Sequence, residues 1–169
     1  MKYKRNNLLT KNDLKDSLLE LLKKKRYECI TVDEICKRAG LNRSTFYYHY
    51  KNIDDLLVDI QREYFEEISN KLRILENKEY SKLYIIDFLK DIRIHDNKFK
   101  LFLEQSPNIF FFENTLEYFY HLYDISNDNS LEMYKAFAEF SRGFMLLAAW
   151  IRNNYDISEL ELAKLMCNE

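Results

Sequence analysis

Two glycines and one proline in 169 residues leave this chain with very few of the residues that build tight turns. An all-β fold needs many such turns, so the sequence argues against one. Leu, Ile, Lys and Glu are abundant instead, which favours helices. Because 47% of the residues are apolar, the chain can also build a sizeable core. We therefore expect an all-α protein, either one ordinary domain or a small module fused to a larger one.

The charge of the chain is divided unevenly along its length. Residues 1–51 carry 13 basic and 6 acidic side chains, a net +7, whereas residues 52–169 carry 13 and 22, a net −9. A basic first part on an acidic body indicates that the first part binds a polyanion such as nucleic acid. A run of charge is also common on an ordinary solvated surface, so this signal needs a motif beside it.

Several classes of protein are disfavoured by what the sequence does not contain. It has neither an N-terminal apolar leader nor an apolar run near 18 residues, so we expect no membrane association and a cytoplasmic location. Cys29, Cys36 and Cys167 are odd in number and lack metal-ligand spacing. They are interpreted as buried, reduced thiols, and we expect neither a metal nor a cofactor.

Hydrophobic periodicity and capping residues predict about nine helices. Thr10 could begin the first, after a short basic opening that we expect to be mobile, and Asn52 with Asp55 could open a long one. The polar segment 124–129 is expected to be a loop. One face of the first helix is expected to carry four leucines: Leu14, Leu18, Leu21 and Leu22. The later helices are expected at 81–95, 99–105, 109–123, 131–153 and 158–166.

The stretch from Thr31 to Tyr50 has the pattern of a helix, a glycine turn and a second short helix. Thr31 and Glu34 form a capping-box signature, and Gly40 stands where a helix C-cap needs a left-handed residue. Apolar residues are spaced to lock the two helices together: Ile35, Ala39, Leu41 and Phe46, with Tyr50 closing the unit. The outward face of the second helix offers hydrogen-bonding and aromatic groups, as a helix in a DNA major groove requires.

This region resembles the tetracycline-repressor (TetR) family of bacterial regulators over roughly residues 8–61. The resemblance is carried by Ile30–Ile35, Ala39–Leu41, Ser44–Lys51, Asn52 and Asp54–Leu57. It implies a three-helix DNA-binding domain at residues 8–52, with its helix-turn-helix motif at about 31–50. It also implies a helical body at residues 53–169 for dimerisation and ligand sensing. Members of the family usually bind palindromic operators as dimers and repress, so we expect a double-stranded DNA operator, a homodimer and a small-molecule effector.

The resemblance also implies which residues meet DNA. Thr31 and Lys51 match phosphate contacts, and Ser44 departs from the glycine or alanine that is common at its position. The matching residues are Thr31, Arg43, Ser44, Thr45, Tyr47, Tyr48, His49 and Lys51. Alternatives stay open for three of them: Thr31 as a helix cap only, Tyr48 as partly packed, and His49 as an ordinary surface histidine. Phe46 and Tyr50 are interpreted as core.

The C-terminal part resembles a TetR subgroup that includes regulators of dihydroxyacetone-kinase operons, through Phe140–Phe144 and Trp150–Arg152 leading to Ile157–Leu160. Gly143 inside a helix costs about 1 kcal/mol relative to alanine, so a close helix–helix approach, such as a two-fold dimer interface, is expected there. Aromatic residues could line an apolar pocket or form plain core: Tyr84, Phe88, Phe102, Phe110, Phe111, Phe112, Phe119 and Phe144. His95 and His121 are expected at the surface.

Two other functional classes are alternatives to a DNA-binding regulator. An enzyme is disfavoured because the chain shows no HExxH motif, no phosphate-binding glycine loop and no nucleophile arrangement. The second alternative is a TetR-like coactivator that acts through protein partners. The intact basic and aromatic second helix of the motif argues against that alternative.

Overall fold

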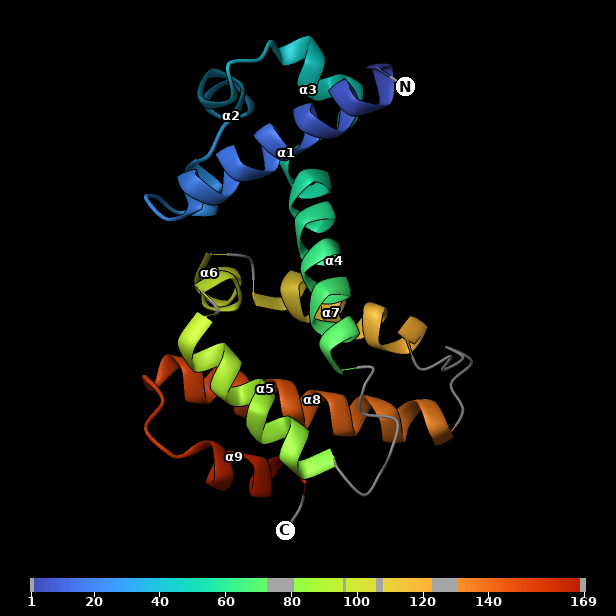
Figure 1. The fold of residues 1–169 in the computed structure, drawn as a ribbon, viewed down its shortest axis with the longest axis vertical. Helices are drawn as coiled ribbons and strands as arrows, with labels where there is room; N and C mark the ends of the chain where they lie inside the picture. The colour runs from blue at the N-terminus through green and yellow to red at the C-terminus, as the bar shows by residue number, and fades with distance from the viewer. Residues whose placement is uncertain (1, 73–80, 96, 106–107, 123–130, 168–169) are drawn as a thin grey trace. The chain divides into compact units, whose positions relative to one another are not determined.

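The computed structural model describes residues 2–72, 81–95, 97–105, 108–122 and 131–167 (Figure 1). Over these residues it contains nine α-helices and no β-strand, as the sequence predicts. Packing divides the chain into two compact units, Met1–Glu63 and Tyr64–Glu169. The division falls inside α4 (Ile53–Leu72), a helix that contributes its first part to one unit and its second part to the other.

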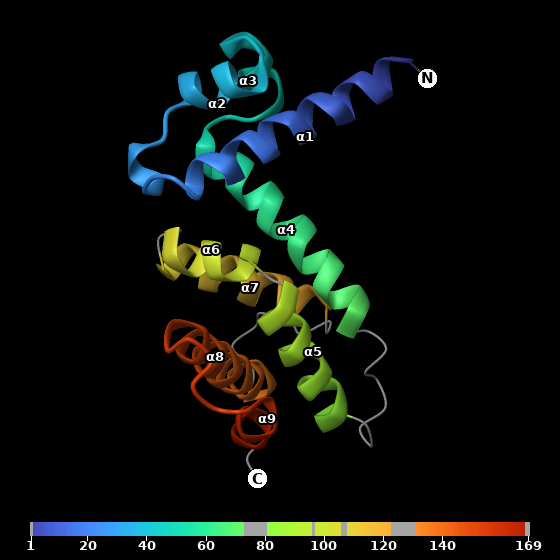
Figure 2. The same cartoon turned by 60° about the vertical axis from the view of Figure 1, so that its left-hand side comes forward.

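The first unit is built on α1 (Lys2–Leu22), with α2 (Val32–Ala39) and α3 (Arg43–His49) lying together on one side of it (Figure 2). A short 3₁₀ turn, Tyr27–Cys29, connects α1 to α2. The predicted leucine face of α1 is confirmed for three of its four members, which are buried, while Leu21 is half-buried. The core of this unit includes Leu14, Leu18, Leu22, Ile35, Phe46, Leu56 and Leu57.

Two expectations for this unit are wrong. The first helix begins at Lys2 and not at Thr10, because no glycine or proline in residues 2–10 stops it from extending toward the N-terminus. Cys29 is exposed and not buried, since it lies in the 3₁₀ turn, none of whose residues is buried. Cys36 is buried as expected, and Cys167 is half-buried.

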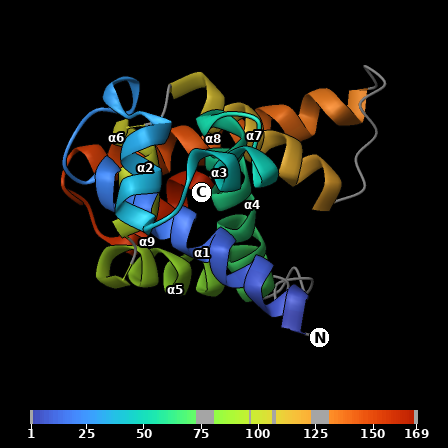
Figure 3. The same ribbon diagram turned by 90° about the horizontal axis from the view of Figure 1, so that it is seen from above.

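The second unit contains α5 (Ser81–His95), α6 (Asn97–Gln105), α7 (Asn108–Leu122), α8 (Leu131–Arg152) and α9 (Glu159–Met166). The predicted helices agree with these to within two residues at each end; the predicted loop at 124–129 lies outside the described residues. Figure 3 shows α7 and α8 running side by side, and α9 packs against both α5 and α8. None of the described helices is long and apolar enough to cross a membrane.

A group of aromatic rings forms the centre of the second unit. Phe111 lies among them, with ring centroids 5.3 Å from Phe99, 5.4 Å from Phe102 and 5.7 Å from Phe144. Such tilted and edge-to-face contacts add to the free energy gained from burying the rings. The aromatic residues of α6, α7 and α8 therefore hold these three helices together.

The connection between α8 and α9 is clamped by Arg93 of α5. Its guanidinium lies 5.0 Å from the Trp150 ring, donates a hydrogen bond to the Ile157 carbonyl at 2.9 Å, and forms an ion pair with Glu159 at 2.9 Å. The Trp150 indole also donates to the Ile157 carbonyl, at 2.9 Å. These bonds hold a turn in which Asn154 and Tyr155 have positive φ values of 57° and 62°.

Candidate nucleic-acid interface

Local hydrogen bonds fix both ends of α2. At its start the Thr31 hydroxyl accepts from the Glu34 N–H at 3.3 Å, and the Glu34 carboxylate accepts from the Thr31 N–H at 3.0 Å, which confirms the predicted capping box. At its end Gly40 has φ +68°. The N–H groups of Gly40 and Leu41 donate to the carbonyls of Lys37 and Cys36, the pattern of a Schellman motif. The turn into α3 is therefore encoded within about ten residues of sequence.

The inner face of α3 is formed by Phe46, which is completely buried. Its ring lies 6.0 Å from that of Tyr50, also buried, and Ile35 of α2 belongs to the same core. The interpretation of Phe46 and Tyr50 as core residues is confirmed. Leu41 and Ala39, expected in the same core, are only half-buried.

The opposite face of α3 is open to solvent. Tyr48 is 71% exposed and the Arg43 side chain 63% exposed, and Ser44 and Tyr47 are also exposed. Thr45 and His49 are half-buried at the edges of this face, while Thr31 and Lys51, before α2 and after α3, are exposed. The seven-residue helix α3 thus has two different faces. One is buried and aromatic, and the other exposes hydrogen-bond donors, hydrogen-bond acceptors and aromatic rings.

Comparison with known families agrees with this geometry. Residues 16–60, which include α2, α3 and the start of α4, match the sequence model of bacterial regulatory proteins of the tetR family. Residues 16–60 are a TetR-family helix-turn-helix domain. A search of curated proteins finds no match to the chain. The resemblance of residues 140–160 to regulators of dihydroxyacetone-kinase operons stays a prediction, because the family match ends at residue 60.

A TetR-type domain supports a role as a DNA-binding transcriptional regulator. Within it, Arg43 begins α3 and is oriented by two neighbours. Its guanidinium lies 3.5 Å from the Asp33 carboxylate of α2 and 6.0 Å from the centre of the Tyr47 ring. The hydrogen bond to Tyr47 and the nearby charges raise the pKa of Arg43, whose guanidinium is cationic in proteins in any case.

Thr31 has a structural role in the TetR-type domain that is visible in its hydrogen bonds. Besides accepting from Glu34, its hydroxyl lies 2.9 Å from the Glu34 carboxylate, to which it donates. A hydrogen bond from Lys25, followed by those from Thr31, lowers the pKa of Glu34 to about 2, so this carboxylate is ionised at neutral pH. Of the two interpretations of Thr31, the helix cap is confirmed, and the phosphate contact stays a prediction.

The last turn of α3 and the residue after it are arranged by α1 and α4. Burial and the nearby charge of Lys11 lower the pKa of His49, so His49 is mainly neutral at pH 7. The Lys51 N–H donates to the Asp55 carboxylate at 3.0 Å. The Asp55 N–H donates to the Asn52 side-chain oxygen at 2.8 Å, as expected if Asn52 caps α4. These bonds fix the backbone of Lys51 and leave its exposed side chain at the end of the candidate interface.

Sequence reasoning missed one group of charged residues in the TetR-type domain. Asp59 of α4 accepts a hydrogen bond from the Tyr50 hydroxyl at 2.8 Å and pairs with Lys15 of α1 at 2.8 Å and with Arg62 at 2.6 Å. Both Asp59 and Lys15 are buried. Burial alone would raise the pKa of Asp59, but the hydrogen bonds from Lys15 and Tyr50 outweigh it and lower the pKa to about 2.

A signal for this group was present in the sequence. Asp59 lies in the stripe of apolar residues on α4, three residues after Leu56 and next to Ile60. A charged residue at such a position needs a partner when it is buried. The Asp59 group, which we define as Asp59, Tyr50 and Lys15, therefore joins the end of the candidate DNA-binding helix to α1 and α4.

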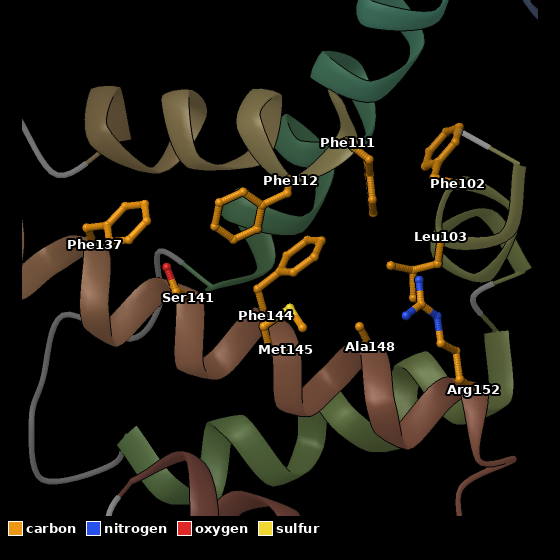
Figure 4. Close-up of a pocket in the computed structure, with 10 residues that line it drawn as sticks. All are labelled: Phe102, Leu103, Phe111, Phe112, Phe137, Ser141, Phe144, Met145, Ala148 and Arg152. Carbon is orange, nitrogen blue, oxygen red and sulfur yellow. The ribbon is translucent and has the colours of Figure 1, made fainter. Parts of the chain in front are cut away.

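The second unit contains a cavity of about 580 Å³ between α6, α7 and α8 (Figure 4). Four of the aromatic residues predicted for an apolar pocket line it: Phe102, Phe111, Phe112 and Phe144. Phe88 is half-buried and does not line it, and the side chains of Tyr84, Phe110 and Phe119 lie outside the described residues. Because Phe102, Phe111 and Phe144 are also buried, the pocket and core interpretations both apply to them.

The remaining lining residues were not predicted. They are Leu103 of α6 and Phe137, Ser141, Met145, Ala148 and Arg152 of α8. Their spacing of three and four residues along α8 marks one helical face, which is the signal that could have identified them. His121 is exposed, as expected, and the side chain of His95 is outside the described residues. Among the described residues, no group of three His, Cys, Asp or Glu side chains could hold a metal ion.

Proposed function

We propose that this protein is a repressor that binds a palindromic operator as a homodimer and leaves it when a small molecule binds the second unit. Residues 8–52 would read the DNA, and residues 53–169 would dimerise and sense the effector. The observation that carries the proposal is the exposed polar and aromatic face of α3 within a TetR-type domain. The chain is not proposed to act as an enzyme.

The proposed DNA contacts divide into two kinds. Arg43, Ser44 and Thr45 lie in the first turn of α3, where a recognition helix meets base edges. Tyr47, Tyr48 and His49 would pack on sugars and bases or reach phosphates, and Thr31 and Lys51 would bind phosphates. The net charge of +7 over residues 1–51 supports attraction to the DNA backbone.

Two features of the second unit support dimerisation through α8 and α9. Leu160 and Leu165 are exposed apolar side chains on α9. Within the chain, a Cβ atom added at Gly143 of α8 would meet only the end of the flexible Met166 side chain, at 3.5 Å, an ordinary contact. Packing inside one chain therefore does not require a glycine here, whereas close approach of a second chain would.

The proposal is tested by genomic footprinting with the tagged full-length protein, followed by binding to the recovered sequence in fluorescence anisotropy. We expect protected sites with two-fold symmetry and half-sites about one helical turn, or 34–36 Å, apart or slightly more.

Lys51→Ala should weaken binding to every sequence similarly and reduce the slope of log affinity against log salt concentration by about one unit. An unchanged slope would remove Lys51 from the contacts, and absence of any protected site would favour the coactivator alternative.

A further inference from the structure

The cavity between α6, α7 and α8 has an uneven distribution of polar groups. Its walls are mostly aromatic and aliphatic, and polar side chains come only from Ser141 and Arg152 among the described lining residues. In Figure 4 the lining side chains of α8 follow the helix from Phe137 at one end to Arg152 at the other, and Phe111 and Phe112 face them from α7. The cavity is thus an apolar space with one cationic end.

The size of the cavity gives a second indication that it receives an occupant. Ser141 lines the cavity, and Figure 4 shows its hydroxyl directed toward α7; this oxygen has no hydrogen-bond partner among the described residues and is enclosed by protein atoms. The cavity volume of about 580 Å³ also falls in the range of small-molecule sites, which is roughly 300–1,000 Å³.

The charges in the lining decide between classes of ligand. None of the described lining residues is acidic, so an organic cation would be desolvated without a partner among them. A sugar or polyol would leave most of its hydroxyls against phenylalanine rings. A molecule with a hydrocarbon body and one acidic group satisfies both ends, because its carboxylate can form charge-assisted hydrogen bonds with the Arg152 guanidinium.

We propose that this cavity binds an unbranched, medium-chain monocarboxylate, with its carboxylate at Arg152 and its hydrocarbon chain among the phenylalanines. The proposal rests on the proposed function only in naming this acid as the effector. Arg152 ends α8 and is exposed, so the carboxylate would lie at the mouth of the cavity. Most of the affinity would then come from burying the chain, and each methylene should lower Kd about fourfold.

The test is isothermal titration calorimetry on the full-length protein with octanoate, decanoate, decan-1-ol and glycerol. Each acid is kept below its critical micelle concentration, and decan-1-ol below its solubility limit. We expect saturable binding of decanoate, about fifteenfold tighter than octanoate, and no binding of glycerol. Arg152→Gln should weaken decanoate about tenfold and leave decan-1-ol unchanged. Lys135→Gln serves as the control, because Lys135 is an exposed cation of α8 outside the lining.

Three results would overturn the proposal: no binding of either acid, loss of acid and alcohol binding by the same factor in Arg152→Gln, or an equal effect of Lys135→Gln. Operator binding is measured separately, by anisotropy with and without decanoate. If decanoate binds but the DNA is retained, the ligand class stands and effector release fails. If the DNA is bound and no acid binds, the regulator stands and the ligand class fails.

Discussion

Arg43 and Phe46 lie three residues apart on α3 and perform opposite tasks. Phe46 is completely buried, whereas the Arg43 side chain is 63% exposed. Arg43 forms an ion pair with Asp33 and lies near the Tyr47 ring, and both of these neighbours are surface residues. We therefore expect a change at Phe46 to act on folding and a change at Arg43 to act on the proposed recognition of DNA. The two substitutions provide a test of which face of α3 meets DNA.

We expect Arg43→Ala to change the stability of the protein by no more than about 0.5 kcal/mol, because it removes an exposed side chain. It should lose about 1–3 kcal/mol of discrimination at one base pair in each half-site. Phe46→Ala should cost about 3–5 kcal/mol of stability through the cavity that it leaves. Thermal melting and operator selectivity are measured for both variants. Normal DNA binding by Phe46→Ala together with melting of Arg43→Ala would show that the inner and outer faces are reversed.

Asp59 should make the stability of the first unit depend on pH in the acid range. Its pKa is lowered to about 2 in the folded protein from an ordinary value near 3.8. A lowered folded pKa means that its contribution is present in full above about pH 4 and is lost as the pH falls toward 2. Asp59→Asn should therefore be less stable than the natural protein at pH 7, by on the order of 2 kcal/mol, and this difference should shrink at pH 2–3.

Urea denaturation at pH 7 and pH 3, followed by circular dichroism, measures this effect. Tyr50→Phe is the matched control: it removes one hydrogen bond to Asp59 but leaves the ion pair with Lys15 at 2.8 Å. We expect it to cost about 1 kcal/mol. A stability difference between Asp59→Asn and the natural protein that is the same at both pH values would contradict the assigned role of the carboxylate.

At the scale of elements, the α2–α3 turn depends on a single backbone conformation. Gly40 has φ +68°, and a Cβ atom added there would meet nothing within 4 Å. Gly40→Ala should thus cost about 1–2 kcal/mol from backbone strain alone, without a steric clash. Gly40→Asn should cost less, because asparagine tolerates the left-handed region better. Chemical denaturation of the three proteins checks this order, and equal stability of Gly40→Ala and the natural protein would refute it.

Local signals predicted α2 and α3 well because their ends are determined by neighbouring residues. The capping box of Thr31 and the left-handed Gly40 each act within a few positions, so they can be recognised in the sequence. The ion pair of Arg43 with Asp33 and the Asp59 group join residues that are distant in sequence or on different helices. Their formation depends on how the helices pack, which periodicity alone does not give. The start of α1 is hard to predict for a different reason: Thr10 can cap a helix, yet no glycine or proline before it prevents the helix from starting at Lys2.

At the scale of the whole molecule, the proposed homodimer decides whether two DNA-binding domains act together. The chain has only two glycines, and they differ in what they require. Gly40 needs its positive φ, whereas Gly143 lies in the regular helix α8, where a Cβ atom would make an ordinary contact. Contacts within the chain therefore give no reason for a glycine at this position, whereas the proposed partner chain would give one.

Gly143→Ala should therefore separate folding from dimerisation. Alanine is favoured over glycine in a helix interior by about 1 kcal/mol, so the folded monomer should be as stable as before or more stable. In a close dimer interface, the added methyl group would cost about 1–3 kcal/mol and raise the dimer dissociation constant about fivefold or more. Sedimentation equilibrium over a range of concentrations measures this constant. Leu165→Ala on α9 should also weaken the dimer. Leu83→Ala on α5, which changes another exposed leucine outside α8 and α9, should not. A natural protein that stays monomeric at micromolar concentration, or a Gly143→Ala variant that dimerises more tightly, would exclude an interface built on this helix face.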